Sequence, residues 1–376
     1  MSRGVYIHIP FCASKCGYCD FYSRTSNVET QEAYIRALCN QIRQYLQNGD
    51  KAIRSIYIGG GTPSVLGNGQ LTVLFQALSG FALAKGGEIT VECNPDSADE
   101  AFFSEIGQCG ANRLSIGAQS LIDEELHKLG RRHNAGQVKK AFDLARHAGF
   151  DNISIDLMLA IPGQTNNSLI KSLQETVKLD PEHISVYILK VEKNTLFEKK
   201  GVPQPDDDIA ADLYLAAAAF LKSHGFEHYE ISNFAKPGKQ AVHNSSYWEG
   251  NEYIAFGCGA YGYLNGIRYH YQKDLQNYIQ NNGLLEPQID EALSPEAIFE
   301  EKRMLSLRTN RGISKKDLNS RQLRFFRQLA AQKLALETSQ SFILTAKGFL
   351  VSNSIIAEME YQQKIQITNL DNESDI

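Results

Sequence analysis

The feature that most restricts the fold is a regular alternation of β-rich and helical segments over the first half of the chain. The β-rich segments are Val5–Ile9, Ile53–Ile58, Glu88–Glu92, Arg113–Ile116, Asn152–Asp156 and His183–Leu189. The helical segments between them are Gln31–Leu46, Gly69–Leu78, Asp99–Cys109, Ala135–Ala148 and Leu169–Leu179. Strands that alternate with helices favour right-handed crossovers and a parallel sheet. We therefore predict an α/β fold with a partial parallel (β/α)6 barrel, whose chemistry lies at the C-terminal ends of the strands.

Three cysteines, Cys12, Cys16 and Cys19, follow the first predicted strand with the spacing C-x3-C-x2-C. No fourth cysteine follows nearby, and a structural zinc site requires four protein ligands. An iron–sulfur cube held by three thiolates instead keeps one iron open for a non-protein ligand. The spacing thus favours a 4Fe–4S cluster, and a zinc-dependent interaction protein is the alternative.

The other four cysteines (Cys39, Cys93, Cys109 and Cys258) lie among apolar neighbours and are expected to be small buried hydrophobes. An odd total of seven cysteines argues against a secreted disulfide framework. The first residues do not form a signal peptide, and no apolar stretch reaches the roughly 18 residues that span a bilayer. We predict a cytoplasmic protein. A formal charge of −5 and a pI near 6.0 give no reason to expect nucleic-acid binding.

A glycine run, Gly59-Gly60-Gly61-Thr62-Pro63, follows the second predicted strand. Consecutive glycines let the backbone approach a ligand closely, and Pro63 fixes the exit of the loop. The run lacks the spacing of a Walker loop or a dinucleotide fingerprint, and alone it indicates a tight turn as readily as a binding loop. Its place one strand after the cysteine loop favours ligand binding.

Polar residues also occur where successive predicted strands end. These are Glu92, Gln119 and Asp156, with Arg131 just beyond Gln119. A single acid in such a position is more often a helix cap. Several on successive strands converge on one pocket, where they are able to hydrogen-bond hydroxyl, amine and carboxylate groups.

These residues carry a family resemblance. The cysteine motif and the glycine run resemble the radical S-adenosylmethionine (SAM) superfamily, whose fold is a partial barrel. The branch is indicated by Tyr6-Ile-His-Ile-Pro10, Glu92-Cys-Asn-Pro95, Arg113-Leu-Ser-Ile-Gly117, Leu129-Gly-Arg131 and Asp156-Leu-Met. It contains oxygen-independent coproporphyrinogen dehydrogenase and the haem chaperone HemW family. The resemblance extends from Tyr6 to about Glu360.

The resemblance implies a cofactor set. Cys12, Cys16 and Cys19 would ligate a 4Fe–4S cluster, whose open iron would bind SAM. The matching positions for SAM are Tyr6, Tyr18, Gly60, Gly61, Thr62, Glu92, Gln119, Arg131 and Asp156. The chemistry implied is one-electron reductive cleavage to methionine and a 5′-deoxyadenosyl radical, fed by a donor such as flavodoxin or ferredoxin.

Two departures separate this chain from the dehydrogenase. The dehydrogenase motif resembles C-x3-C-x2-C-x-C, and here the fourth position is Phe21. The dehydrogenase also carries an N-terminal extension, whereas this sequence begins five residues before Tyr6. Both departures resemble the chaperone family, so we do not expect coproporphyrinogen dehydrogenase activity. Oxidative decarboxylation of propionates to vinyls by a radical SAM dehydrogenase stays the alternative.

The segment His243-Asn-Ser-Ser-Tyr247-Trp248 resembles the H-N-x-x-Y-W motif of the haem chaperones. An imidazole is an axial haem ligand in many proteins, and Tyr247 and Trp248 would supply flat apolar surface. From residue chemistry alone, a histidine satisfied by neighbouring backbone, with an aromatic pair that packs the barrel mouth, is the simpler interpretation. Tyr261 stands where relatives often have histidine, which leaves the axial ligands open.

We therefore expect a chaperone that carries a 4Fe–4S cluster and SAM, binds haem as cargo, and delivers it to haem-requiring client proteins. The domains expected are a radical SAM barrel (1–235), a connecting segment with the H-N-x-x-Y-W motif (236–285) and a winged-helix-like domain (286–365), then a frayed tail (366–376). The last domain is predicted from a basic amphipathic helix, Arg321–Lys333, and a β-wing at Phe342–Phe349. The client, the radical turnover, homodimer formation and transient membrane association stay open.

Overall fold

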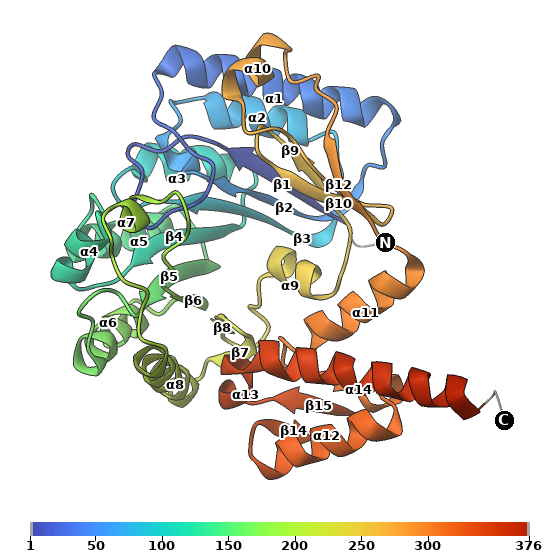
Figure 1. Ribbon diagram of the computed structural model, residues 1–376. Coiled ribbons are helices and arrows are strands. Elements are labelled where there is room, and N and C mark those ends of the chain that lie inside the picture. The colour runs from blue at the N-terminus through green and yellow to red at the C-terminus, as the bar shows by residue number, and fades with distance from the viewer. Residues whose placement is uncertain (1–2, 374–376) are drawn as a thin grey trace.

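A computed structural model describes residues 3–373, and in this part of the chain twelve strands form one curved sheet (Figure 1). The strand order is β12-β11-β10-β9-β1-β2-β3-β4-β5-β6-β8-β7. The strands of the predicted barrel are β1 (Gly4–Ile9), β2 (Ala52–Gly60), β3 (Ala82–Cys93), β4 (Arg113–Gln119), β5 (Ile153–Leu159) and β6 (His183–Ile188). They pair in sequence order and in parallel. The α/β class and the parallel barrel strands are thus confirmed.

Helices connect these strands and cover the outer face of the sheet (Figure 1). They are α1 (Val28–Asn48), α2 (Gln70–Leu78), α3 (Glu100–Gln108), α4 (Asp123–Leu129), α5 (Ala135–His147) and α6 (Asn166–Lys178), with the 3₁₀ turn η1 (Pro63–Val65). Local sequence explains where several begin. Asn134 and Thr165, for example, each accept a backbone N–H of the first turn in a capping box.

The sheet extends beyond the predicted barrel at both edges. On one side lie β8 (Asn233–Ala235) and β7 (Glu227–Glu230), and on the other β9 (Tyr253–Phe256), β10 (Tyr261–Leu264), β11 (Ile267–His270) and β12 (Gln288–Ala292). Strand β9 pairs in parallel with β1, so the expected connecting segment 236–285 contributes strands to the barrel sheet. Strands β12 and β7 stand at opposite ends of the strand order, and the barrel is partial, as predicted.

The C-terminal unit packs beside β7 and helix α8 (Asp207–Ser223) (Figure 1). It consists of α11 (Pro295–Ser306), β13 (Ile313–Ser314), η2 (Lys315–Asp317), α12 (Ser320–Ala331), β14 (Ala335–Glu337), β15 (Ser341–Leu344), α13 (Ala346–Leu350) and α14 (Ser352–Glu373). The predicted wing at Phe342–Phe349 is wrong in position. The hairpin is β14–β15, and the chain turns helical at α13 because Thr345 caps it.

A winged-helix-like class for this unit stays a prediction. Of the expected tail, residues 366–373 continue helix α14, and residues 374–376 lie outside the described part of the chain. The remaining helices are α7 (Leu196–Lys199), α9 (Val242–Trp248) and α10 (Leu275–Gln280). Over residues 3–373, each helix is too short or too polar to cross a bilayer.

Candidate cofactor site

The cysteine loop between β1 and α1 opens into a cavity of about 480 Å³ at the C-terminal ends of the barrel strands. All residues predicted for the cluster and for SAM line this cavity, except Tyr6. They are Cys12, Cys16, Tyr18, Cys19, Gly60, Gly61, Thr62, Glu92, Gln119, Arg131 and Asp156. Tyr6 lies behind the wall: its hydroxyl is 2.9 Å from His8 Nδ1, and its ring stacks on that of Tyr57.

The glycine run brings the second loop against the cysteine loop. Gly60 has φ +107°, and a Cβ on Gly61 would lie 2.5 Å from the carbonyl oxygen of Phe11. Only glycine permits this conformation and this approach. Backbone N–H groups of Gly61 and Thr62 donate to Ile9 O and Phe11 O at 2.8 and 2.7 Å. The Thr62 hydroxyl therefore lies beside the cysteine loop and donates to Cys12 Sγ at 3.5 Å.

Arg131 places a positive charge against the cysteine loop. Gly130 has φ 72° and ends α4, so that the next residue turns back toward the cavity. The Arg131 guanidinium donates to Cys16 Sγ at 3.3 Å and to Asn94 Oδ1 and Gly117 O at 2.7 Å. A Cβ on Gly117 would lie 2.8 Å from Asn94 Oδ1, so glycine is needed where these groups converge.

Two acids, Glu92 on β3 and Asp156 on β5, are held by donors from the protein. Glu92 accepts the Tyr57 hydroxyl at 2.6 Å and the Gly60 N–H at 3.0 Å. Burial raises the pKa of Glu92 to about 7, and these two hydrogen bonds limit the rise. Asp156 accepts hydroxyl hydrogen bonds from Ser115 at 2.8 Å and Ser154 at 3.1 Å. Both carboxyl groups are thus fixed in orientation at the cavity wall.

Gln119 lies at an irregularity in strand β4. It has φ 66°, a left-handed conformation that is rare for residues other than glycine, and the register between β4 and β5 shifts just before it. Such backbone strain is common at ligand sites. The shift turns the end of β4 so that Gln119 lines the cavity.

Sequence reasoning missed several lining residues, including Tyr57, Asn94, Ser115 and Tyr187. Asn94 belongs to the motif Glu92-Cys-Asn-Pro95, so its position after a strand was a usable signal. Tyr57 and Ser115 lie inside their strands, and the strand period of two places them on the same face as the pocket. Phe21, which replaces a cysteine of the related motif, also lines the cavity and is 62% exposed.

The donor set fits an iron–sulfur cluster better than a single ion. In residues 3–373, no three or more His, Cys, Asp or Glu side chains lie close enough to hold one metal ion. In a 4Fe–4S cube each thiolate binds a different iron, so its cysteines stand farther apart than zinc ligands do. Thr62 and Arg131 donate hydrogen bonds to Cys12 Sγ and Cys16 Sγ, and hydrogen bonds to the sulfur atoms are among the contacts that tune such clusters. The partly exposed thiols and the polar strand ends share one cavity that has room for a nucleotide-sized ligand.

The residues predicted to contact haem do not face this cavity. His243 is fully buried on α9; its Nδ1 lies 2.9 Å from Ser55 Oγ and its Nε2 lies 2.7 Å from the Tyr247 hydroxyl. Burial, helped by the charge of Arg113, lowers the pKa of His243 to about 3 and keeps the ring neutral. Glu88 accepts the backbone N–H groups of Val242 and His243 at 2.8 and 2.9 Å.

His243 is thus satisfied within the protein, as residue chemistry alone favoured, but its ring partners are the hydroxyl groups of Ser55 and Tyr247 and not the neighbouring backbone. Trp248, at the end of the same helix, lines a second cavity described below. Tyr261 is 48% exposed and stacks on His270, with ring centroids 5.1 Å apart. The described structure therefore offers no pair of free axial ligands in the α9 motif.

Comparison with known proteins matches this geometry. A family model described as the radical SAM superfamily matches residues 6–176. The chain is 35% identical over 371 residues to "Heme chaperone HemW" of Bacillus subtilis (strain 168), which covers 94% of this chain and 98% of the relative. It is 39% identical over 263 residues to the protein of the same name from Escherichia coli (strain K12), covering 69% of each chain.

Among solved structures, coproporphyrinogen III oxidase (HemN) from Escherichia coli, described as a radical SAM enzyme, superposes with a TM-score of 0.80. The match covers 95% of this chain and 89% of that one at 22% identity. It shows that the two chains share a fold from the cysteine loop into the C-terminal unit.

Proposed function

We infer the function of this chain from its family: it belongs to the HemW family within the radical SAM superfamily. We propose that it binds haem and delivers it, in the cytoplasm, to client proteins that require haem. The observation that carries this proposal is the 35% identity over nearly the whole length of a protein named a haem chaperone. The cofactor cavity alone does not carry it, because the fold is shared with a coproporphyrinogen oxidase.

Cys12, Cys16 and Cys19 would hold a 4Fe–4S cluster, and the strand-end residues would hold SAM beside it. When bound, this pair supplies one-electron reductive chemistry, with electrons from a donor such as flavodoxin or ferredoxin. The protein contributes the orientation. Arg131 and Thr62 donate hydrogen bonds to the cysteine sulfur atoms, and the fixed carboxyl groups of Glu92 and Asp156 are acceptors for ligand hydroxyl and amine groups.

For haem, we propose the motif His243, Tyr247 and Trp248. Because both ring nitrogens of His243 are engaged, coordination of the iron would replace the hydrogen bond to the Tyr247 hydroxyl. That exchange requires Tyr247 to turn away and the fully buried imidazole of His243 to become accessible.

The test is a titration of the purified protein with hemin, followed at the Soret band, before and after anaerobic reconstitution of the cluster. We expect saturable one-to-one binding in both states, followed by transfer to an added apo-haem protein. Absence of binding in both states would contradict the proposal.

A second assay on the same preparation tests the alternative function. With reductant, SAM and coproporphyrinogen III under anaerobic conditions, we expect SAM cleavage at most and no sustained protoporphyrinogen. Continued formation of protoporphyrinogen would identify a dehydrogenase instead.

A further inference from the structure

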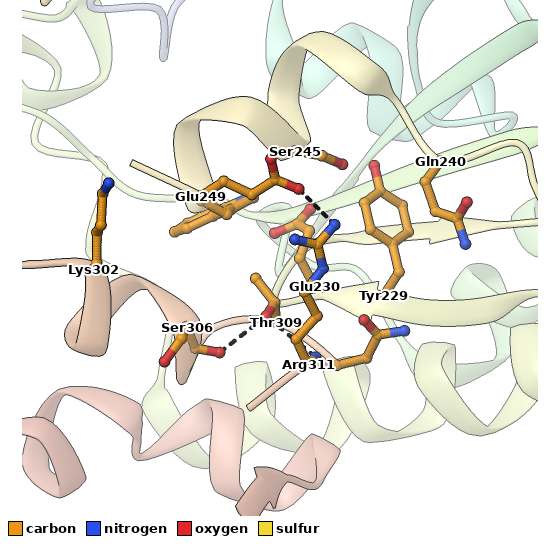
Figure 2. A pocket seen from close by; sticks show the side chains of 11 residues that line it. Tyr229, Glu230, Gln240, Ser245, Glu249, Lys302, Ser306, Thr309 and Arg311 are labelled. Atoms are coloured by element: carbon orange, nitrogen blue, oxygen red, sulfur yellow. Dashed lines mark hydrogen bonds and ion pairs between the residues drawn. The ribbon is translucent and has the colours of Figure 1, made fainter. Parts of the chain in front are cut away.

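A second cavity, of about 400 Å³, lies between the barrel edge and the C-terminal unit. Its walls come from β7, the end of α9, α11 and the loop after α11. The segment 308–310 bonds to the end of β7: Ile231 N–H donates to Arg308 O and Asn310 N–H to Tyr229 O. Figure 2 shows the side chains that meet here.

Glu230 is the unusual residue in this cavity. It is 1% exposed and stands at the end of β7, where its backbone forms an isolated antiparallel β-bridge with that of Thr309. One carboxylate oxygen, Oε2, accepts the Ser232 N–H at 3.2 Å, whereas Oε1 is buried without a hydrogen-bond partner at normal distance. The side chain of Asn233 on the neighbouring strand β8 is a nearby polar group, and like the Ser232 N–H it acts to lower the pKa of Glu230. A buried carboxylate oxygen without a donor is costly, and native proteins seldom keep one without a reason. Glu92 differs from Glu230 because each of its carboxylate oxygens accepts a hydrogen bond.

The cations around the cavity do not neutralise Glu230. Arg311 pairs with Glu249, with 2.5 Å between Nη2 and Oε1 (Figure 2). The aliphatic stem of Lys302 lies against Gly250, and its side chain is exposed at the rim. Trp248 and Tyr229 add aromatic surface to the wall. The cavity thus combines an uncompensated buried acid with aromatic rings.

We propose that this cavity is a binding site for a small organic cation that carries an ammonium or guanidinium group. Such a group donates the hydrogen bond that Glu230 Oε1 lacks, and its charge is attracted by the indole face of Trp248. Burial raises the pKa of Glu230 to about 7, and a bound cation would favour the ionised form. Haem does not fit this chemistry, because its propionates would meet a buried acid. The proposal is therefore independent of haem binding.

The chain provides its own reporter, since Trp248 is its single tryptophan and lines the cavity. The experiment titrates the full-length protein with methylguanidinium chloride at constant ionic strength and records tryptophan emission. N-methylurea, which is similar in shape and neutral, is the matched ligand. We expect a saturable change with methylguanidinium and none with N-methylurea.

Two variants complete the test. Glu230→Gln keeps the shape of the side chain and should weaken methylguanidinium binding at least tenfold. Glu124→Gln makes the same charge change at an exposed site on α4 and should leave binding within twofold. No saturable change in the wild type, an equal response to N-methylurea, or unaltered binding in a folded Glu230→Gln protein would each overturn the proposal. The comparison of the two ligands on the wild type stands even if that variant fails to fold.

Discussion

The cysteine loop and the α9 motif are both candidate ligand sets, and the structure treats them in opposite ways. Cys12, Cys16 and Cys19 are partly exposed and line an open cavity, so their sulfur atoms are accessible to a cofactor. His243 is fully buried, and both of its ring nitrogens are engaged in hydrogen bonds within the protein. The cysteine loop is thus open to a cofactor. His243 instead stabilises the fold, and a ligand has to replace one of its hydrogen bonds in order to bind.

The largest effect is expected at the cysteine loop. Cys19→Ala should reduce reconstituted iron from about four per chain to fewer than one, because the cube loses one of its three thiolates. The free energy of unfolding of the iron-free protein should change little, since this thiol is only partly buried. Iron and acid-labile sulfide analysis measures the first effect. The control is Cys109→Ala, at a partly buried thiol outside the cavity, which should keep the full cluster. A complete cluster in Cys19→Ala would show that Cys19 is not a cluster ligand.

The next largest effect should come from beneath α9. Glu88 accepts two backbone N–H groups of the helix and lies 3.8 Å from Arg113, and both side chains are buried. Glu88→Gln leaves a buried guanidinium without its counter-charge, which should lower the free energy of unfolding by about 3 kcal/mol. Urea unfolding measures this change. Glu291→Gln removes one of the two acids that pair with Arg268, at an exposed position, and should cost below about 1 kcal/mol. Equal losses of unfolding free energy in Glu88→Gln and Glu291→Gln would show that Glu88 does not anchor α9.

Replacing His243 tests whether the motif has a second role. His243→Ala removes two buried hydrogen bonds and leaves a cavity, so we expect a loss of about 2–3 kcal/mol in unfolding free energy. If the imidazole also coordinates haem, hemin affinity should fall about tenfold, which corresponds to about 1.4 kcal/mol. Ser55→Ala removes only the partner of Nδ1 and should cost about 1 kcal/mol without altering hemin affinity. Unchanged hemin affinity in His243→Ala would leave the motif purely structural.

The difference between the cysteine loop and the α9 motif also explains which features could be predicted from the sequence. The six barrel strands are apolar runs between amphipathic helices, and strand ends in a parallel sheet share one edge. This rule alone placed Glu92, Gln119, Arg131 and Asp156 in one pocket, and the full set of twelve cluster and SAM residues came from the family resemblance. Eleven of the twelve line one cavity, and Tyr6 lies behind its wall. The strands β7 to β12 were missed because they have three to five residues each, too few to show a periodic pattern.

The environment of His243 could not be predicted, because it depends on long-range contacts. Its Nδ1 partner, Ser55, is 188 residues away in the sequence, and the cap of its helix, Glu88, is 155 residues away. No local pattern indicates that a polar strand residue will meet a distant imidazole. The unpartnered oxygen of Glu230 likewise arises where the C-terminal unit closes over β7.

A variant with a small expected effect on stability gives the sharpest test of how α9 changes between its two roles. Tyr247→Phe keeps the ring and removes only the hydroxyl that engages His243 Nε2 at 2.7 Å. The lost hydrogen bond should lower the free energy of unfolding by about 1 kcal/mol. Because the iron no longer competes with this hydroxyl, hemin should bind severalfold more tightly, with a Soret spectrum typical of imidazole coordination. Tyr253→Phe, whose ring packs against Tyr247, is the matched control and should leave hemin affinity unchanged. Weaker hemin binding in Tyr247→Phe would mean that the hydroxyl itself assists the haem, and that α9 need not open at His243.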